Sequence, residues 1–140
     1  MSRIFWDTNL FIYLFEDNGK FSESVVTLRE RMNARGDQLY TSTLTVGEIL
    51  VKPMRQGDAR LVDAYKDALA RTAILLTFTS DAAIHYASIR TDKSIKAPDA
   101  LQLSCAAQSG MDLFITNDRR LAGKIVPGIQ FIVPLNAAYL

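Results

Sequence analysis

The stretch Arg3-Ile4-Phe5-Trp6-Asp7-Thr8-Asn9 contains an apolar, strand-like run that ends at a single acidic residue. The same arrangement returns near the other end of the chain, in Leu113-Phe114-Ile115-Thr116-Asn117-Asp118. Glu48 comes shortly after another β-rich run, and Asp99 opens a helical pattern. Because the carboxyl ends of parallel strands line one crevice, this repeated placement predicts an α/β fold with four acids at one edge of its sheet.

Strand-like and helix-like patterns alternate along the rest of the chain. We expect strands at residues 2–6, 39–42, 74–78, 113–116 and 130–133. We expect helices at 8–16, 22–35, 46–52 (ending before Pro53), 58–70, 98–109 and 119–124, and one capped by Ser80 that covers Ile84, Ala87 and Ile89. This alternation is typical of βαβ units around a central, mostly parallel sheet flanked by helices. We find no linker or internal repeat, so residues 1–140 are expected to form a single domain.

Composition limits the possible classes of protein. A chain of 140 residues with 49% hydrophobic and 22% charged residues has enough apolar material for a core, and its net charge of +1 gives no bulk signature of a nucleic-acid binder. Cys105 is the only cysteine, which excludes an intrachain disulfide, and its helical surroundings favour a buried, inert thiol. We see neither a signal peptide nor an apolar run long enough to span a membrane, and therefore expect a cytoplasmic protein.

The four acids Asp7, Glu48, Asp99 and Asp118 are the candidate metal ligands. Carboxylates that converge at one sheet edge repel one another unless a cation joins them, and Mg²⁺ or Mn²⁺ takes oxygen ligands of this kind. Small polar residues lie beside two of the acids and would orient ligands, waters or phosphates: Thr8, Asn9, Thr116 and Asn117.

Each acid also has a structural explanation. Thr45 and Glu48 match a capping box, Asp99 follows a proline in a first helical turn, and Asp7 and Asp118 are suited to be helix N-caps. Four caps at one sheet edge would still place four acids near one another, so their joint arrangement favours the metal site.

Four segments of the sequence together resemble the PIN-domain family of metal-dependent nucleases, and in particular the VapC-type toxins of toxin–antitoxin pairs. They are Phe5-Trp6-Asp7-Thr8-Asn9, Thr45-Val46-Gly47-Glu48-Ile49-Leu50, Lys96-Ala97-Pro98-Asp99-Ala100-Leu101-Gln102-Leu103 and Phe114-Ile115-Thr116-Asn117-Asp118-Arg119-Arg120-Leu121. The resemblance implies a PIN-like domain and an endoribonuclease that uses one or two Mg²⁺ or Mn²⁺ ions. It implies that Asp7, Glu48 and Asp99 hold the principal ion, that Asp118 binds directly or through water, and that an antitoxin protein is the partner.

Positive charge near the acids would guide the RNA backbone. Lys93 and Lys96 precede Asp99, and Arg119 and Arg120 follow Asp118, so these four are candidates for phosphate contacts. The alternative is a solvated basic surface. Trp6 is expected in the core, with base stacking as its less favoured role.

Apolar residues early in the chain exceed what one face of a short helix needs. They belong to the core, to a homodimer contact or to a groove for an antitoxin helix: Leu10, Phe11, Tyr13, Leu14, Phe15, Phe21, Val51, Pro53 and Met54. Other functions also remain open. They are RNA processing without an antitoxin, a receiver-like Mg²⁺-binding phosphoacceptor, and a non-catalytic RNA- or protein-binding module.

Overall fold

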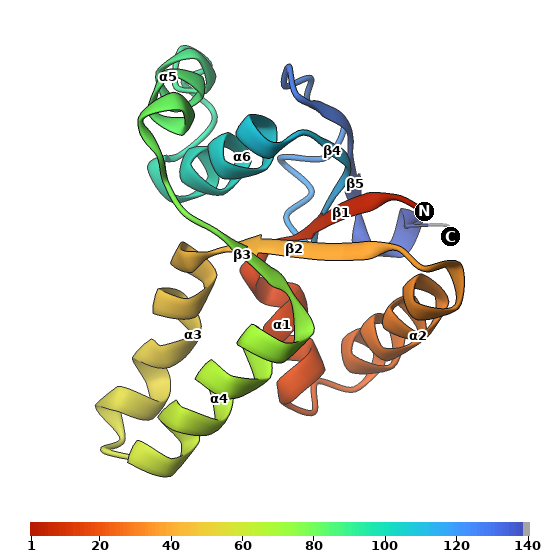
Figure 1. Ribbon diagram of the computed structural model, residues 1–140, viewed down its shortest axis with the longest axis vertical. Coiled ribbons are helices and arrows are strands. Elements are labelled where there is room, and N and C mark those ends of the chain that lie inside the picture. The colour runs from red at the N-terminus through yellow and green to blue at the C-terminus, as the bar shows by residue number, and fades with distance from the viewer. Residues whose placement is uncertain (139–140) are drawn as a thin grey trace.

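Five strands form one sheet in the order β3-β2-β1-β4-β5, and every neighbouring pair is parallel. The strands are β1 (Arg3–Trp6), β2 (Gln38–Ser42), β3 (Ile74–Leu76), β4 (Met111–Thr116) and β5 (Ile129–Pro134). The computed structural model describes residues 1–138. The expected α/β class with a parallel sheet flanked by helices is confirmed (Figure 1).

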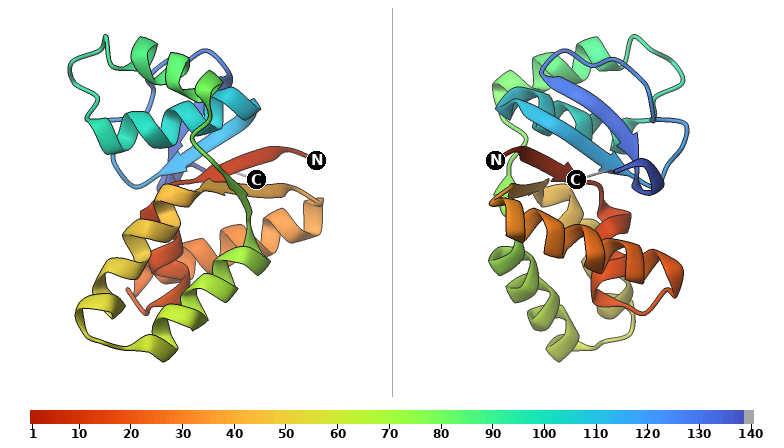
Figure 2. Two further views of the ribbon diagram at one scale, coloured as in Figure 1. Left: turned by 60° about the vertical axis from the view of Figure 1, so that its left-hand side comes forward. Right: turned by 90° about the vertical axis from the view of Figure 1, so that its right-hand side faces the viewer.

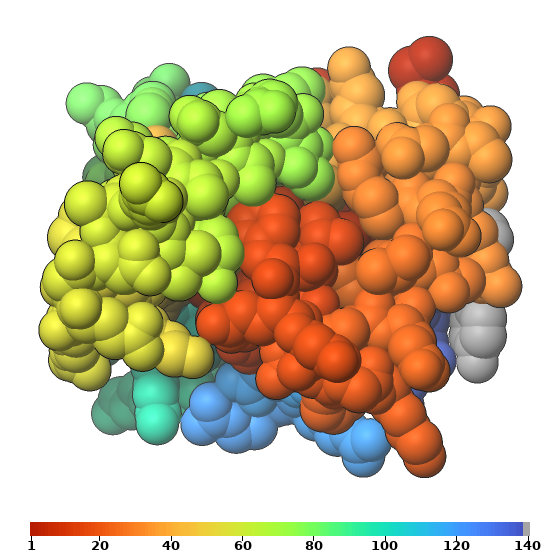
Figure 3. All heavy atoms as spheres, turned by 90° about the horizontal axis from the view of Figure 1, so that it is seen from below, coloured from red at the N-terminus to blue at the C-terminus, as the bar shows by residue number. Residues whose placement is uncertain are grey.

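Helices cover both faces of this sheet. They are α1 (Thr8–Phe15), α2 (Lys20–Arg35), α3 (Thr43–Arg55), α4 (Ala59–Thr72), α5 (Ser80–Ile89) and α6 (Ala97–Ser109), followed by the short 3₁₀ helix η1 (Leu135–Ala137). The first four helices lie on one face, and α5 and α6 lie on the other (Figures 1 and 2). From below, α1 lies between α2 on one side and the α3–α4 pair on the other (Figure 3). None of the helices described is long and apolar enough to cross a membrane.

Alternating side chains of the central strands pack into two separate cores. Trp6 is fully buried with Ile4 and Ile115 on the side of α1 to α4, and its ring centroid lies 5.3 Å from that of Phe11. Phe5 points to the opposite side and stacks on Phe114 with 5.0 Å between ring centroids. Burial on both faces explains the continuous apolar runs of these strands. The expected core position of Trp6 is confirmed. Because its ring is fully buried, it cannot stack on a base.

The order of the strands creates a switch point between β1 and β4. From β1 the chain builds β2 and β3 to one side, then crosses to the other helical layer and returns beside β1 as β4. The amide of Asp7 donates to the carbonyl of Ile115 at 3.0 Å, so the ends of the two strands lie together. Such switch points are where open α/β sheets bind their ligands.

The expected end of helix α3 before Pro53 is wrong. The helix continues through this proline to Arg55. Proline has no amide hydrogen, so it removes one backbone hydrogen bond of a helix. Here only two further helical residues follow Pro53, so the helix tolerates that loss. Pro53 is buried, and its carbonyl accepts the amide of Asp58 just after the helix at 3.0 Å.

Two further expectations about helices are wrong. The helix expected at residues 119–124 is absent: residues 119–123 form turns, and the amide of Gly123 donates to the carbonyl of Ile132 in β5 at 3.0 Å. The N-cap of α5 is Thr79 rather than Ser80, since the Thr79 hydroxyl accepts the amide of Ala82 at 3.1 Å.

Cys105 is buried as expected, and this burial raises the pKa of its thiol to about 11.

Candidate active site

Four acids from four elements line one cavity of about 320 Å³. Asp7 follows β1, Glu48 lies in α3, Asp99 lies in the first turn of α6, and Asp118 lies in the loop after β4. The remaining lining residues are Thr8, Asn9, Ile12, Pro98 and Gln102. The structure thus brings all four sequence-predicted acids to the same edge of the sheet.

Asp7 is the most deeply buried of these acids, with 8% of its surface exposed. Its Oδ1 accepts the amide of Thr8 at 2.9 Å, which makes it the N-cap of α1, and its Oδ2 accepts the hydroxyl of Thr116 at 2.9 Å. Burial raises the pKa of Asp7 from 3.8 to about 6, with smaller contributions from the charges of Asp99 and Glu48, while the two hydrogen bonds oppose the rise. Asp7 is therefore both a cap and a member of the acid cluster.

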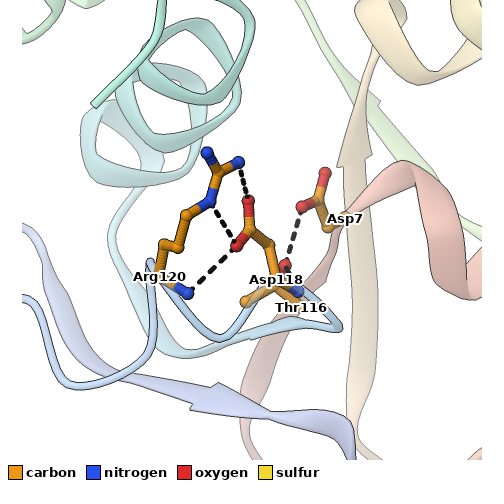
Figure 4. A network of polar contacts seen from close by, with 4 residues as sticks. All are labelled: Asp7, Thr116, Asp118 and Arg120. Carbon is orange, nitrogen blue, oxygen red and sulfur yellow. Dashed lines mark hydrogen bonds and ion pairs between the residues drawn. The ribbon is translucent and has the colours of Figure 1, made fainter. Parts of the chain in front are cut away.

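Thr116 connects Asp7 to Asp118. Its buried hydroxyl donates to Asp7 and accepts the backbone amide of Asp118 at 3.0 Å, so one side chain orients both acids (Figure 4). Asn117, the next residue, instead donates to the hydroxyl of Tyr13 at 2.9 Å and anchors the loop to α1. Of the small polar residues predicted near the acids, Thr8, Asn9 and Thr116 lie at the cavity or against Asp7, and Asn117 faces elsewhere.

Glu48 is exposed and accepts the hydroxyl of Thr8 at 2.6 Å. The capping box suggested by the sequence is wrong. The N-cap of α3 is Ser42, whose hydroxyl accepts the amide of Leu44 at 3.1 Å, and Thr45 is fully buried inside the helix. Glu48 is therefore free of any role at the helix start.

Asp99 and Asp118 differ in their electrostatic surroundings. Burial raises the pKa of Asp99, as do the charges of Asp118 and Glu48, against the opposing charges of Arg120 and Lys96. The pKa of Asp118 is lowered, chiefly by hydrogen bonds from Arg120. The Arg120 side chain donates to both carboxylate oxygens of Asp118, and its amide donates to one of them (Figure 4).

The four basic candidates occupy different positions. Lys96 and Arg120 act electrostatically on Asp99 and Asp118 and so lie close to the cavity. Arg119 lines a separate cavity with Asn117, and Lys93 is exposed in the loop before α6. Only two of the four are therefore placed beside the acids.

The acids fit a divalent cation by their chemistry, since carboxylate oxygens are the ligands that Mg²⁺ and Mn²⁺ prefer. Within residues 1–138, however, no three Asp, Glu, His or Cys side chains are close enough together to hold one ion. Mg²⁺ commonly keeps several waters and is held by one or two carboxylates, so fewer than three of these acids suffice for a first ion.

Sequence reasoning missed the polar residues behind Glu48. Gln102, which is 2% exposed, joins Thr8 on α1 to Thr45 on α3 through its side-chain amide. A glutamine in the otherwise apolar interior of α6 was the available signal, because a buried amide needs hydrogen-bond partners.

The strand order and the acid-lined cavity at the switch point define an α/β protein with an oxygen-donor site. The chain belongs to the PIN domain family, whose model matches residues 4–124. The resemblance drawn from the four sequence segments is thereby confirmed. A comparison with curated proteins finds no matching sequence.

Several solved structures share this fold and come from toxin–antitoxin complexes. VapBC2 from Rickettsia felis, bound to a DNA fragment from its promoter, has 16% identity and a TM-score of 0.75, over 94% of this chain and 98% of that one. DNA-bound VapBC from Salmonella typhimurium has 21% identity and a TM-score of 0.71, over 96% and 99%. VapBC-5 from Mycobacterium tuberculosis has 17% identity and a TM-score of 0.62, over 96% and 99%. At these identities the likeness is one of fold.

Proposed function

We propose that this chain is a divalent-metal-dependent endoribonuclease that acts in the cytoplasm as the toxin of a toxin–antitoxin pair. The observation that carries the proposal is the convergence of Asp7, Glu48, Asp99 and Asp118 on one cavity of a PIN-domain chain. We assign these four acids as the catalytic ligands of one or two Mg²⁺ or Mn²⁺ ions. An ion held by these acids would supply an activated water for attack and neutralise charge on the phosphate.

The protein's own groups prepare this site in distinct ways. Thr116 orients Asp7 and the Asp118 loop, and Thr8 orients Glu48. Lys96, at the start of α6, supplies positive charge near Asp99 and is the best placed of the basic residues to meet an RNA phosphate. The main role that we propose for Arg120 is to neutralise the charge of Asp118, and contact with RNA is its secondary role.

The fold argues against a receiver-like phosphoacceptor. In receiver domains the first strand lies between the second and the third, whereas here β1 lies between β2 and β4. A nuclease that processes RNA without an antitoxin, or a binding module without activity, would share the PIN fold. Activity and growth assays separate these from the proposed toxin.

The test is cleavage of a labelled structured RNA by purified, partner-free protein with Mg²⁺ or Mn²⁺ and with EDTA. Asp99→Asn should slow cleavage at least about 100-fold, because it removes the charge of one proposed metal ligand. Asp63→Asn is the matched control, since exposed Asp63 lies on α4 outside the cavity. Cleavage that survives both EDTA and Asp99→Asn would refute the proposal.

The toxin role has its own test in a bacterial host. Expression of the chain should arrest growth, and Asp99→Asn should relieve the arrest while the protein still accumulates. Normal growth during expression of an active nuclease would favour RNA processing instead.

The proposed partners are an antitoxin protein and a second copy of the chain. Support comes from large apolar side chains on the surface, where Phe21 is 47%, Val51 45% and Met54 61% exposed. From the same sequence-predicted group, Leu10 and Phe11 lie in the core, and Pro53 is buried in α3. Light scattering should give a mass of twice 15.6 kDa for a homodimer, and a mass of 15.6 kDa would refute the dimer.

A further inference from the structure

A chain of buried polar side chains runs behind Glu48 and joins four elements. Gln102 of α6 is at its centre, with Thr8 of α1, Ser42 of β2 and Thr45 of α3 around it. These four side chains are between 0% and 7% exposed. Because buried polar groups destabilise a fold unless they are hydrogen-bonded, such a set of contacts has few alternative arrangements.

The direction of the Gln102 amide follows from Ser42. The Ser42 hydroxyl accepts the amide of Leu44 and donates its proton to Oε1 of Gln102. The Nε2 group of Gln102 then donates one hydrogen to Thr8 Oγ1 at 3.1 Å and the other to Thr45 Oγ1 at 2.8 Å. All of the hydrogen-bonding groups of this side chain are thereby directed.

The Thr45 proton is directed away from Thr8. The Thr41 hydroxyl donates to the carbonyl of Trp6 at 2.9 Å, so in its 2.8 Å contact with Thr45 it can only accept. Thr45 is the donor in that contact. The oxygen of Thr45, 3.1 Å from that of Thr8, competes with Glu48 for the Thr8 proton, but it already accepts from Gln102. Because a carboxylate can only accept, Thr8 donates to Oε1 of Glu48 at 2.6 Å and accepts from Gln102.

Glu48 depends on that proton for its position. Its side chain is exposed, and the hydrogen bond from Thr8 is the one that residues 1–138 supply to its carboxylate. A glutamate has several rotatable bonds, and an exposed one without a partner samples many rotamers. The Thr8 hydroxyl is thus the contact that holds this carboxylate at the cavity.

We propose that Gln102 is a positioning residue of the acid cluster, because it fixes the direction of the Thr8 hydroxyl that holds Glu48. The effect on metal binding rests on the proposed function, whereas the effect on the orientation of Glu48 does not. Partners of this kind behind a metal ligand typically change metal affinity by roughly 10- to 100-fold when they are removed.

The experiment compares wild type with Gln102→Met, Thr8→Val, the double variant and Thr8→Ser. Methionine keeps the length of Gln102 and removes its donor and acceptor, and serine keeps the hydroxyl of Thr8. Ser104→Ala is the matched control, since buried Ser104 lies on the same helix and bonds only the carbonyl of Leu101 among the described residues. Thermal unfolding of each variant identifies those that remain folded.

The first readout is the side-chain order of Glu48 in metal-free protein, measured by NMR relaxation. We expect Glu48 to be ordered in wild type, Ser104→Ala and Thr8→Ser, and mobile in Gln102→Met and Thr8→Val. The double variant should be no more mobile than either single one, because both substitutions break the same connection. An ordered Glu48 in Thr8→Val overturns the proposal even if Gln102→Met does not fold. A further loss of order in the double variant also overturns it, because Gln102 would then act by another route.

The second readout is Mn²⁺ affinity, measured from the spin-resonance signal of the free ion. Gln102→Met should weaken Mn²⁺ binding by about 10-fold or more, while Ser104→Ala leaves it unchanged. Equal affinity in Gln102→Met and wild type would overturn the link to the metal site. If wild type binds no Mn²⁺ but Gln102→Met still frees Glu48, the positioning role is supported and the metal-dependent nuclease is refuted.

Discussion

The guanidinium of Arg120 holds Asp118 through both of its carboxylate oxygens, with Nε 3.1 Å from Oδ1 and Nη2 2.7 Å from Oδ2. The amide of Arg120 adds a third bond to Oδ1 at 3.0 Å. This contact neutralises one of the four acids from within the chain. A cation that binds directly to Asp118 therefore competes with the guanidinium, and an exposed ion pair of this kind is weak.

Replacement of Arg120 by glutamine should tighten Mn²⁺ binding. It frees the oxygens of Asp118 and removes a positive charge, and the gain in affinity should be up to about fivefold, because an exposed ion pair is weak. Calorimetric titration of the metal-free protein measures it. Arg119→Gln is the control, because it changes the net charge equally while Arg119 lines another cavity. Equal changes in both variants would show that the contact with Asp118 is irrelevant.

Thr116→Val should disturb Asp7 and Asp118 together. Valine keeps the shape of threonine and removes the hydroxyl that donates to Asp7 and accepts from Asp118. We expect the pKa of Asp7 to rise above about 6 and metal affinity to fall by roughly 10-fold or more. Carboxyl NMR titration and Mn²⁺ binding measure the two effects. Thr116→Ser, which keeps the hydroxyl, should restore both, and its failure to do so would point to packing instead.

The sequence predicted the parts of this molecule that depend on local pattern. Both faces of β1 and β4 are buried, so each reads as a continuous apolar run, and the acid after each run marks the end of a strand. Asp7 and Asp118 were found in this way, and parallel topology then implied that they lie near one another. The four acids do share a cavity, as that reasoning required.

Contacts between distant elements lay beyond the sequence patterns. Thr45 and Glu48 have the spacing of a capping box, yet β2 enters α3 so that Ser42 takes the cap and Thr45 turns inward. Gln102 contacts Thr8 across 94 residues of chain, a separation at which no local pattern operates. The pairing of Arg120 with Asp118 depends on the turn that replaces the expected helix at 119–124.

Gly128→Ala should destabilise the fold strongly, because the turn before β5 approaches α6 at this glycine. Gly128 has a φ of +99°, and an added Cβ would lie 2.5 Å from the carbonyl oxygen of Ala107. Backbone strain together with overpacking should cost about 2–5 kcal/mol. Gly123→Ala, with a φ of +79° and open space around it, should carry the strain alone. Urea unfolding measures both, and equal losses would mean that the close approach to Ala107 does not matter.

Asp7→Asn should stabilise the metal-free protein at neutral pH. The pKa of Asp7 is raised by folding from 3.8 to about 6, so its contribution to stability is fully present below pH 3.8 and is lost as the pH rises through about 6. A rise of this size corresponds to roughly 3 kcal/mol, at 1.36 kcal/mol for each pKa unit. Asparagine does not ionise, so the variant escapes this loss.

The quantity to measure is the difference in unfolding free energy between Asp7→Asn and wild type, in EDTA, from about pH 4 to about pH 7.5. Taking the difference cancels the acids that both proteins share, including Asp118, whose lowered pKa acts in the opposite direction. The difference should grow by about 2–3 kcal/mol in favour of the variant across this range, because part of the loss has already occurred at pH 4. Saturating Mn²⁺ should reverse the order at pH 7.5, because only wild type keeps the Asp7 carboxylate as a ligand. A difference that stays flat with pH would mean that burial does not hold Asp7 in its protonated form.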